Sequence, residues 1–333
     1  MKLSDIGEFG LIRRFSPAFL KDLPAGVTGI GDDCAVLPWK KDRLLLVTTD
    51  LLVEDVHFLK AKIGARDLGY KTLAVNLSDI AAMGGTPSSA FLSIGLSRDM
   101  DVPWLDEFFR GFACLARAAK VRLLGGDTTG SPGPLVINVA LLGEARSDRV
   151  KYRSGAGEGD IICVTGFLGD SGGGLRVLLE DRPTGPDERH LVRRHNRPRA
   201  HLAEGAWLAA QNSVTAMMDV SDGIDSDLRR IMERSRCGVA VDLGALPLSA
   251  PLRRAAGKYG WDPLELAAAG GEDYCLLATV RPGRFAKISS AFARRFRRPL
   301  FRIGTIAGPK AGLIYVRDGR PAVLKRRGFD HFG

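Results

Sequence analysis

Five short segments of the chain carry aspartates in a setting that suits phosphate chemistry. They are Gly31-Asp32-Asp33, Thr48-Thr49-Asp50, Asn76-Leu77-Ser78-Asp79, Gly125-Gly126-Asp127-Thr128-Thr129 and Asp219-Val220-Ser221-Asp222-Gly223. None of these segments contains a lysine or arginine that would neutralise its carboxylates. Carboxylates that gather without cations repel one another, whereas divalent ions between them remove that cost. The set therefore favours a site for several metal ions and phosphate, although any single aspartate is more typical of a turn or helix cap.

Apolar runs lead into two of these segments. Leu44-Leu45-Leu46-Val47 precedes the Thr-Thr-Asp, and Val121 to Leu124 precedes the Gly-Gly-Asp. Runs of this kind are typical of buried strands. We therefore expect Asp50 and Asp127 to follow the C-terminal ends of their strands, where α/β folds bind ligands.

The wider pattern predicts an α/β chain in two parts. Helices are expected over 5–15, 65–83, 103–119, 174–180, 201–211 and 224–235, and strands over 44–48, 89–96, 135–142, 161–165, 215–218 and 239–243. The polar, glycine-rich stretch from Arg146 to Asp160 is typical of a domain boundary. We expect an N-terminal domain over 1–147 and a C-terminal domain over 148–333.

Length and composition exclude several classes of protein. With 333 residues, 45% hydrophobic and 26% charged, the chain is an ordinary globular protein long enough for two cores. No apolar run reaches the length of a membrane span, and Met1-Lys2-Leu3-Ser4-Asp5 lacks the features of a secretory signal. The cysteines are scattered and form no C-x-x-C pair: Cys34, Cys114, Cys163, Cys237 and Cys275. They are typical of reduced residues in a cytosolic protein, so we expect a cytoplasmic location and no membrane partner.

The net charge of +10 raises the question of a nucleic-acid partner. Arginine doublets occur late in the chain, including the run Arg294-Arg295-Phe296-Arg297-Arg298. They lie on amphipathic stretches such as Ile288 to Phe296, where apolar positions can face a core and arginines the solvent. Since no nucleic-acid-binding motif accompanies them, we expect no nucleic-acid partner. No role follows from the sequence for the arginines of 294–302.

Two further features bear on phosphate binding. The loop from Gly166 to Gly174 joins an expected strand to an expected helix and could offer backbone N–H groups to an anion. It contains no G-x-x-x-x-G-K-[ST] pattern, and a tight turn with close helix packing explains it equally well. Arg153 precedes this loop, and a guanidinium binds phosphate through a bidentate fork. Alone, an arginine at that point is more typical of an exposed linker.

Several motifs occur in a characteristic order. They are Gly29-Ile30-Gly31-Asp32-Asp33-Cys34-Ala35, Thr48-Thr49-Asp50 with His57-Phe58, Ala74-Val75-Asn76-Leu77-Ser78-Asp79-Ile80-Ala81-Ala82-Met83-Gly84, Gly125-Gly126-Asp127-Thr128, Asp219-Val220-Ser221-Asp222-Gly223 and Gly270-Gly271-Glu272-Asp273-Tyr274. The ordered set closely resembles the bacterial thiamine-monophosphate kinase family, in the superfamily of aminoimidazole ribonucleotide synthetase and selenophosphate synthetase. The resemblance runs from about Gly7 to the tail Gly328-Phe329-Asp330-His331-Phe332.

The resemblance implies a fold, an activity and a set of site residues. The implied fold is an N-terminal mixed-sheet domain that pairs in a homodimer and a C-terminal α/β domain that completes the active site, as in aminoimidazole ribonucleotide synthetase. The implied activity is ATP-dependent phosphorylation of thiamine monophosphate to thiamine diphosphate, with several Mg²⁺ ions.

The implied metal ligands are Asp33, Thr48, Thr49, Asp50, Asp79, Asp127, Asp219 and Asp222. The implied ATP contacts are Asp33, Thr48, Gly126, Asp127, Arg153 and Ser221. The implied substrate contacts are His57, Glu272, Asp273 and Phe329, and Cys34 is interpreted as a packing residue.

This chemistry agrees with the residue types. Two unit charges 4 Å apart interact by about 1 kcal/mol in water and about 4 kcal/mol at an effective dielectric near 20, so joining two phosphates needs charge neutralisation. Magnesium prefers carboxylate, phosphate and water oxygens. The acceptor phosphate is already an anionic nucleophile, so direct in-line transfer needs positioning and neutralisation but no general base.

Three alternatives stay open at this point. The first is another ATP-using synthetase of the superfamily; the selenophosphate enzyme is disfavoured because it uses an N-terminal cysteine with a nearby lysine, whereas the first cysteine here is Cys34. The second is a non-catalytic binding protein, which would be expected to leave gaps in the aspartate set. The third is a basic nucleic-acid-binding protein. ATP turnover measured with and without thiamine monophosphate would separate them.

Overall fold

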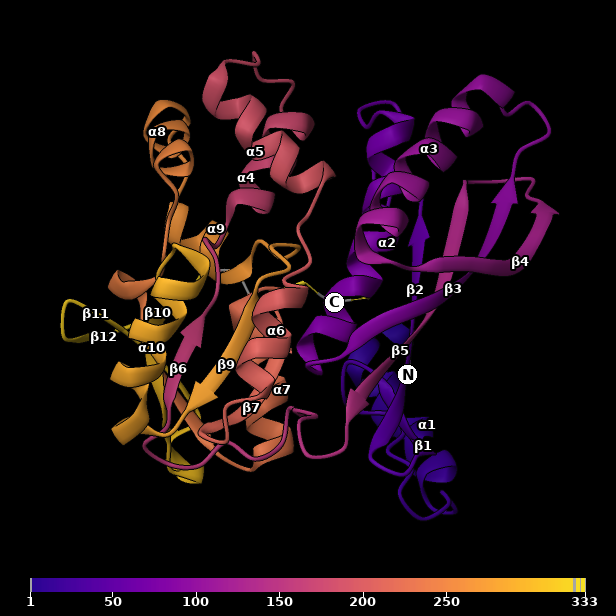
Figure 1. Ribbon diagram of the computed structural model, residues 1–333. Helices are drawn as coiled ribbons and strands as arrows, with labels where there is room; N and C mark the ends of the chain where they lie inside the picture. Colours follow the sequence, from indigo (N-terminus) through magenta and orange to yellow (C-terminus); the bar gives the residue numbers. More distant parts are fainter. Residues whose placement is uncertain (1, 326–327, 330, 333) are drawn as a thin grey trace.

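The computed structural model describes residues 2–325, 328–329 and 331–332. Two groups of elements, each around its own sheet, lie side by side (Figure 1). The first contains a five-stranded sheet in the order β1-β2-β5-β3-β4. Its strands are β1 (Ala35–Lys40), β2 (Arg43–Val53), β3 (Thr86–Leu96), β4 (Arg122–Gly130) and β5 (Val136–Arg146). All neighbours are antiparallel except β3 and β4, so the sheet is mixed, as predicted.

A helical layer covers one face of this sheet. The N-terminal helices are α1 (Gly7–Leu20), α2 (Ala65–Ala82) and α3 (Val102–Ala119), with a short 3₁₀ helix at Leu3–Asp5. Helix α2 packs against β2 and β5 and is crossed by α3. The crossing is close because a Cβ at Gly69 would lie 1.9 Å from the Phe108 oxygen, and one at Gly111 would lie 1.9 Å from the Arg66 oxygen. Only glycine fits at both points, so the crossing holds α2 firmly in place.

The second group of elements is built on a seven-stranded sheet in the order β12-β11-β8-β10-β6-β9-β7. Its strands are β6 (Ile161–Val164), β7 (Val214–Asp219), β8 (Gly238–Asp242), β9 (Leu276–Val280), β10 (Phe301–Ala307), β11 (Leu313–Arg317) and β12 (Arg320–Ala322). Its helices are α4 (Asp170–Leu179), α5 (Pro186–Asn196), α6 (Leu202–Ala209), α7 (Ile224–Ser235), α8 (Ala250–Tyr259), α9 (Pro263–Ala269) and α10 (Pro282–Phe296), with 3₁₀ turns at Leu243–Ala245 and Pro309–Ala311. The two-domain α/β class is therefore confirmed, while the predicted boundary at 147/148 stays a prediction.

Contacts between the two groups centre on α2. This helix touches α6 and β7, and a Cβ at Gly205 of α6 would lie 2.1 Å from the oxygen of Ala81. At a second point, Lys62 Nζ donates hydrogen bonds to the Leu178 carbonyl (2.5 Å) and to Asp181 Oδ1 (2.9 Å). Helix α2 thus contacts elements of both groups, and Lys62, which precedes α2, adds a second link between them.

Several predicted boundaries were wrong in ways that matter for the site. Thr48, Thr49 and Asp50 lie inside β2, which continues to Val53, and Asp127 lies inside β4. Their strands run on because β5 pairs along the whole of β2, and β3 pairs along β4. Neither aspartate therefore follows a strand end.

The glycine loop also differs from its prediction. Residues Gly172 to Gly174 belong to α4, which begins at Asp170. A Cβ at Gly174 would lie 2.3 Å from the Leu191 oxygen of α5. These glycines therefore serve close helix packing, the second of the two interpretations that the sequence left open.

Candidate active site

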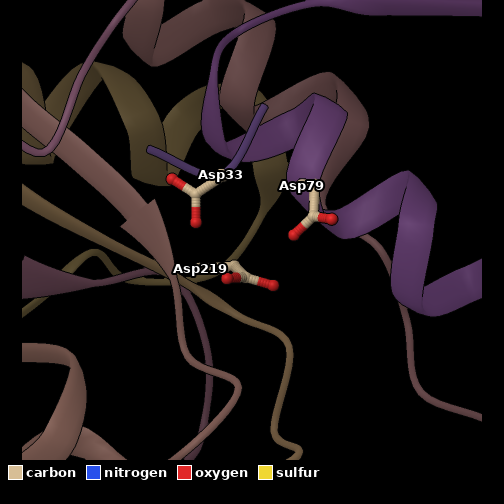
Figure 2. Close-up of side chains that lie close together, drawn as sticks. All are labelled: Asp33, Asp79 and Asp219. Atoms are coloured by element: carbon tan, nitrogen blue, oxygen red, sulfur yellow. The ribbon is translucent and has the colours of Figure 1, made fainter. Parts of the chain in front are cut away.

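Three aspartates from distant parts of the chain meet between the two sheets. Asp33 precedes β1, Asp79 lies in the last turns of α2, and Asp219 ends β7. One carboxylate oxygen from each lies within 4.8 Å of the others, and Figure 2 shows the three side chains around one common space. Asp33 and Asp219 are buried, and Asp79 is partly buried. The structure therefore brings together three of the predicted metal ligands.

Neighbouring donors fix the orientation of these carboxylates. Thr48 Oγ1 donates to Asp79 Oδ2 (2.5 Å), and Ser78 Oγ donates to Asp219 Oδ2 (2.6 Å). Arg153 Nη2 donates to Asp33 Oδ1 at 2.9 Å. The sequence segments contain no basic partner, but the fold supplies one from far along the chain, so Arg153 is neither exposed nor a free linker residue.

Burial and mutual repulsion disfavour the charged forms of these groups. Burial raises the pKa of Asp219 to about 8, and the charge of Asp33 adds to the shift. Burial raises the pKa of Asp50 to about 6, helped by the charges of Asp222 and Asp33. The pKa of Asp79 rises well above its usual range for the same reasons, burial first and then the charge of Asp50. A site with these properties binds either protons or cations.

The donor set fits magnesium better than any softer metal. The cluster consists of carboxylate oxygens, which hard divalent cations prefer, and among the described residues no sulfur or imidazole ligand belongs to it. Among the described residues, Asp33 Oδ2 is buried and has no hydrogen-bond partner. An orphaned carboxylate oxygen beside two others is the feature that a bound cation would satisfy.

A cavity of about 640 Å³ opens over this cluster. Most of the predicted site residues line it: Asp33, Thr48, Thr49, Asp50, His57, Asp79, Arg153, Asp219, Ser221, Asp222, Glu272 and Phe329. The lining comes from both groups of elements and from the C-terminal tail. The carboxylates and the ring-bearing residues therefore belong to one continuous space.

Rings line another part of the cavity. The His57 and His331 rings lie 4.9 Å apart, and the Phe329 ring meets His331 edge to face at 4.8 Å. His57 Nδ1 accepts a hydrogen bond from Val53 N at 3.0 Å, which fixes the orientation of the imidazole. The tail is held in place because Phe329 N donates to the Asp222 carbonyl at 3.1 Å. These rings offer flat faces to a planar ligand.

Three predicted site residues lie elsewhere in the described part of the chain. Gly126 and Asp127 are exposed on β4, at the opposite edge of the sheet from β1, and do not line the cavity. Asp273 is buried, and its carboxylate accepts hydrogen bonds from Gly169 N (2.6 Å) and Ser171 N (3.2 Å). The backbone N–H groups at the start of α4, which could have bound an anion, are therefore bound to an aspartate of the protein itself.

Sequence reasoning did not identify four further residues of this region. Asp227 lines the cavity with a buried oxygen that has no hydrogen-bond partner among the described residues. Lys71, His195 and His331 lie at or near the ring-lined part. Asp227 sits one turn into the helix that follows Asp222, and that spacing could have predicted it. Lys71 offered no such signal, since a lysine on a helix is usually exposed.

The chain matches two domain families in sequence. The N-terminal domain of AIR synthase related proteins matches residues 31–145, and the C-terminal domain of the same proteins matches 157–316. Thiamine-monophosphate kinase of Salmonella typhimurium is 39% identical over 328 residues, which cover 98% of each chain. The chain belongs to the thiamine-monophosphate kinase family. The thiamine-monophosphate kinase of Escherichia coli K12 is 38% identical over 328 residues, which again cover 98% of each chain.

Solved structures of the thiamine-monophosphate kinase family agree. AaThiL complexed with AMPPCP and TMP is 34% identical and covers 99% of both chains, with a TM-score of 0.86. Thiamine-monophosphate kinase from Stenotrophomonas maltophilia is 36% identical, with a TM-score of 0.76 over 95% of this chain and 98% of that one. Within the described residues, no helix is both long and apolar enough to cross a membrane.

Proposed function

We propose that this chain transfers the γ-phosphoryl group of ATP to the phosphate of thiamine monophosphate. An acceptor oxygen forms the new bond to the γ-phosphorus, the bond to the β,γ-bridging oxygen breaks, and ADP leaves with that electron pair. The observation that carries the proposal is the single cavity that joins a buried carboxylate cluster to a ring-lined part. Full-length similarity to thiamine-monophosphate kinases supports the same reaction.

We propose that the cluster holds several magnesium ions. Asp33, Asp79 and Asp219 form its centre, and other cavity residues extend it: Thr48, Thr49, Asp50 and Asp222. Bound magnesium would neutralise the phosphate charges and lower the repulsion between donor and acceptor. The carboxylates would bind the cations in a low-dielectric setting, where charge neutralisation has its largest effect.

Two further side chains are suited to the ATP phosphates. Arg153 lines the cavity, and its Nε is buried without a hydrogen-bond partner among the described residues. A guanidinium with a free N–H can hold a phosphate oxygen while its other nitrogen stays on Asp33. Ser221 also lines the cavity, beside Asp222. We assign both residues to the nucleotide.

We propose that Asp127 acts from a second copy of the chain in a homodimer. Within one protomer, β4 lies three strands from β2, or about 14 Å at the usual strand spacing. That separation keeps Asp127 away from Asp50 of the same protomer. The sheet carries exposed apolar side chains at Leu51, Phe91 and Leu124, which a partner would cover. A two-fold contact through this sheet would bring β4 of each copy toward β2 of the other.

At the other part of the cavity we place the thiamine rings. His57 and Phe329 supply aromatic faces, and the Glu272 carboxylate supplies a negative charge for the thiazolium cation. Asp273 is left out of this set because its carboxylate is already occupied by the backbone of α4.

We also keep the prediction of a cytoplasmic location, since all five cysteines are free.

Phe329→Ala should raise the KM for thiamine monophosphate more than the KM for ATP. The ring is half-exposed in the cavity wall and would lose stacking worth about 0.5–1.5 kcal/mol, about a two- to twelvefold change in affinity. Steady-state kinetics with each substrate varied in turn would measure it. Phe332→Ala serves as the control, because that tail phenylalanine is similarly exposed but does not line the cavity. An equal change in both KM values would place the tail away from the acceptor.

The acceptor class can be tested with thiamine that lacks its phosphate. We expect thiamine monophosphate to be converted to the diphosphate, and free thiamine to give no monophosphate, because a neutral hydroxyl needs a general base and lacks the charge that would bind the magnesium ions. Chromatography of products formed with ATP and magnesium would show both results. Efficient phosphorylation of thiamine would overturn the proposed acceptor. ATP turnover without any thiamine compound would favour another synthetase of the superfamily.

A further inference from the structure

Lys71 is a buried lysine for which the proposed reaction has so far supplied no role. It lies on α2, about two turns before Asp79, with a relative exposure of 0%. Its Nζ donates to the His57 carbonyl at 3.2 Å and lies 2.9 Å and 3.1 Å from the two carboxylate oxygens of Glu272. A buried ion pair adds little net stability once desolvation is counted. The pair therefore points to a role in positioning.

The Lys71–Glu272 pair joins the two groups of elements. Glu272 belongs to the loop from Gly270 to Tyr274, which enters β9, whereas Lys71 belongs to the helix that covers the first sheet. The backbone of this loop is strained, because Glu272 and Tyr274 have φ angles of +55° and +49°. Residues other than glycine adopt such angles only where their neighbours hold them. Glu272 N donates a hydrogen bond to the Ser221 carbonyl (2.7 Å), and the Glu272 carboxylate forms an ion pair with Lys71.

No other full positive charge supports this carboxylate in the described part of the chain. His195 Nδ1 lies 3.2 Å from Glu272 Oε2, but burial, with the charge of Lys71, lowers the pKa of His195 to about 4. The imidazole is therefore neutral near pH 7. Burial alone would raise the pKa of Glu272, yet the charge of Lys71, the largest opposing cause, together with its hydrogen bond, brings that pKa below its usual range. Lys71 thus keeps Glu272 ionised before any cation enters the cavity.

We propose that Lys71 is a positioning residue for the acceptor: it holds the Glu272 carboxylate across the contact between the two groups of elements, where that carboxylate lines the cavity. The inference rests on the proposed function, in which Glu272 faces the thiazolium cation. Lys71 itself lies behind the carboxylate and is not a lining residue. It acts on the acceptor through Glu272 alone.

Lys71→Met tests this role, since methionine keeps an unbranched side chain and removes the charge. We expect the KM for thiamine monophosphate to rise about tenfold or more, with the KM for ATP changed less than about threefold, because only the acceptor end loses a held group. Binding of thiamine monophosphate without ATP, measured by calorimetry, should weaken by a similar factor. Lys71→Arg should recover most of the acceptor affinity, because a guanidinium also pairs with a carboxylate.

Two comparisons separate positioning from a general loss of stability. The double variant Lys71→Met/Glu272→Gln leaves no unpaired charge, so its KM for thiamine monophosphate should be no higher than that of Glu272→Gln alone. Lys62→Met removes the other lysine that bridges the two groups of elements, at Leu178 and Asp181, and should leave both KM values unchanged.

Each outcome decides the matter. Equal rises in both KM values for Lys71→Met, no rise at all, or additive effects in the double variant would overturn the inference while wild-type turnover of thiamine monophosphate still supports the proposed function. Absence of that turnover in the wild type would overturn the proposed function itself. If Lys71→Met alone folds poorly, the double variant and Lys71→Arg give the same decision.

Discussion

Asp219→Asn should abolish turnover while leaving the fold intact. Asp219 lies at the centre of the carboxylate cluster and contributes a negative charge that asparagine cannot supply. Loss of one charged ligand from a magnesium–phosphate site costs about 4 kcal/mol of transition-state stabilisation, or about a thousandfold in rate. The side-chain oxygen of asparagine can still accept the hydrogen bond from Ser78, so folding is preserved. The measurement is kcat at saturating magnesium, with circular dichroism to check the fold.

Asp160→Asn provides the matched control for this variant. Asp160 is also a buried aspartate of the second group of elements, but it precedes β6, and its carboxylate accepts hydrogen bonds from Gly157 N (2.9 Å) and Thr215 Oγ1 (2.6 Å). Because β6 and β7 both pair antiparallel with β9, the start of β6 and the end of β7 lie at opposite ends of the sheet. The control should lose thermal stability but keep kcat. If Asp219→Asn kept more than about a tenth of wild-type turnover, its assignment as a metal ligand would be wrong.

Heterodimers of two inactive variants should regain activity if Asp127 acts across the dimer. Asp127→Asn and Asp219→Asn should each be inactive as homodimers. In a mixed dimer, one site combines an intact Asp219 with the partner's Asp127, so turnover per dimer should return to about half of the wild-type value. Co-expression with two affinity tags and purification through both would give the mixed species for assay.

The control for this experiment is a mixed dimer of two variants whose substituted residues belong to the same carboxylate cluster. Asp79 and Asp219 come from the same protomer, so mixing Asp79→Asn with Asp219→Asn leaves each site with one damaged ligand and should restore nothing. Recovery in that control, or failure of the Asp127 pair to recover after both tags co-purify, would refute the exchange of Asp127 between subunits. Failure of the tags to co-purify would refute the dimer.

The residue types of the site could be predicted from sequence more reliably than their placement. Asp219 is the last residue of β7, one position past the expected end of that strand at 218, because β7 is short and ends there. Asp50 and Asp127 do not, because the hydrogen-bonded partners of β2 and β4 continue past them and keep the chain extended. Strand order is a non-local property: β5 and β3 both lie between β2 and β4, and that order separates Asp127 from Asp50.

The partners of the charged residues were less predictable still. The Arg153–Asp33 pair joins residues 120 positions apart, and the Lys71–Glu272 pair joins residues 201 apart. No local pattern distinguishes these basic residues from those on solvated helix faces. Helix α5 was missed for a related reason, since its sequence Pro-Asp-Glu-Arg-His-Leu-Val-Arg-Arg-His-Asn has few apolar residues to show a helical period.

The close crossing of α2 and α3 at Gly69 and Gly111 has a consequence for the choice of acceptor. Lys71 and Asp79 lie on the same helix, eight residues or about 12 Å apart along its axis. Asp79 lines the part of the cavity assigned to the phosphates, whereas Lys71 pairs with Glu272, which lines the part assigned to the rings. Since the crossing prevents α2 from sliding, helical rise fixes the distance between these two parts. We therefore expect a molecule with a shorter or longer chain between ring and phosphate to fill one part and miss the other, so that the acceptor is selected by length as well as by charge.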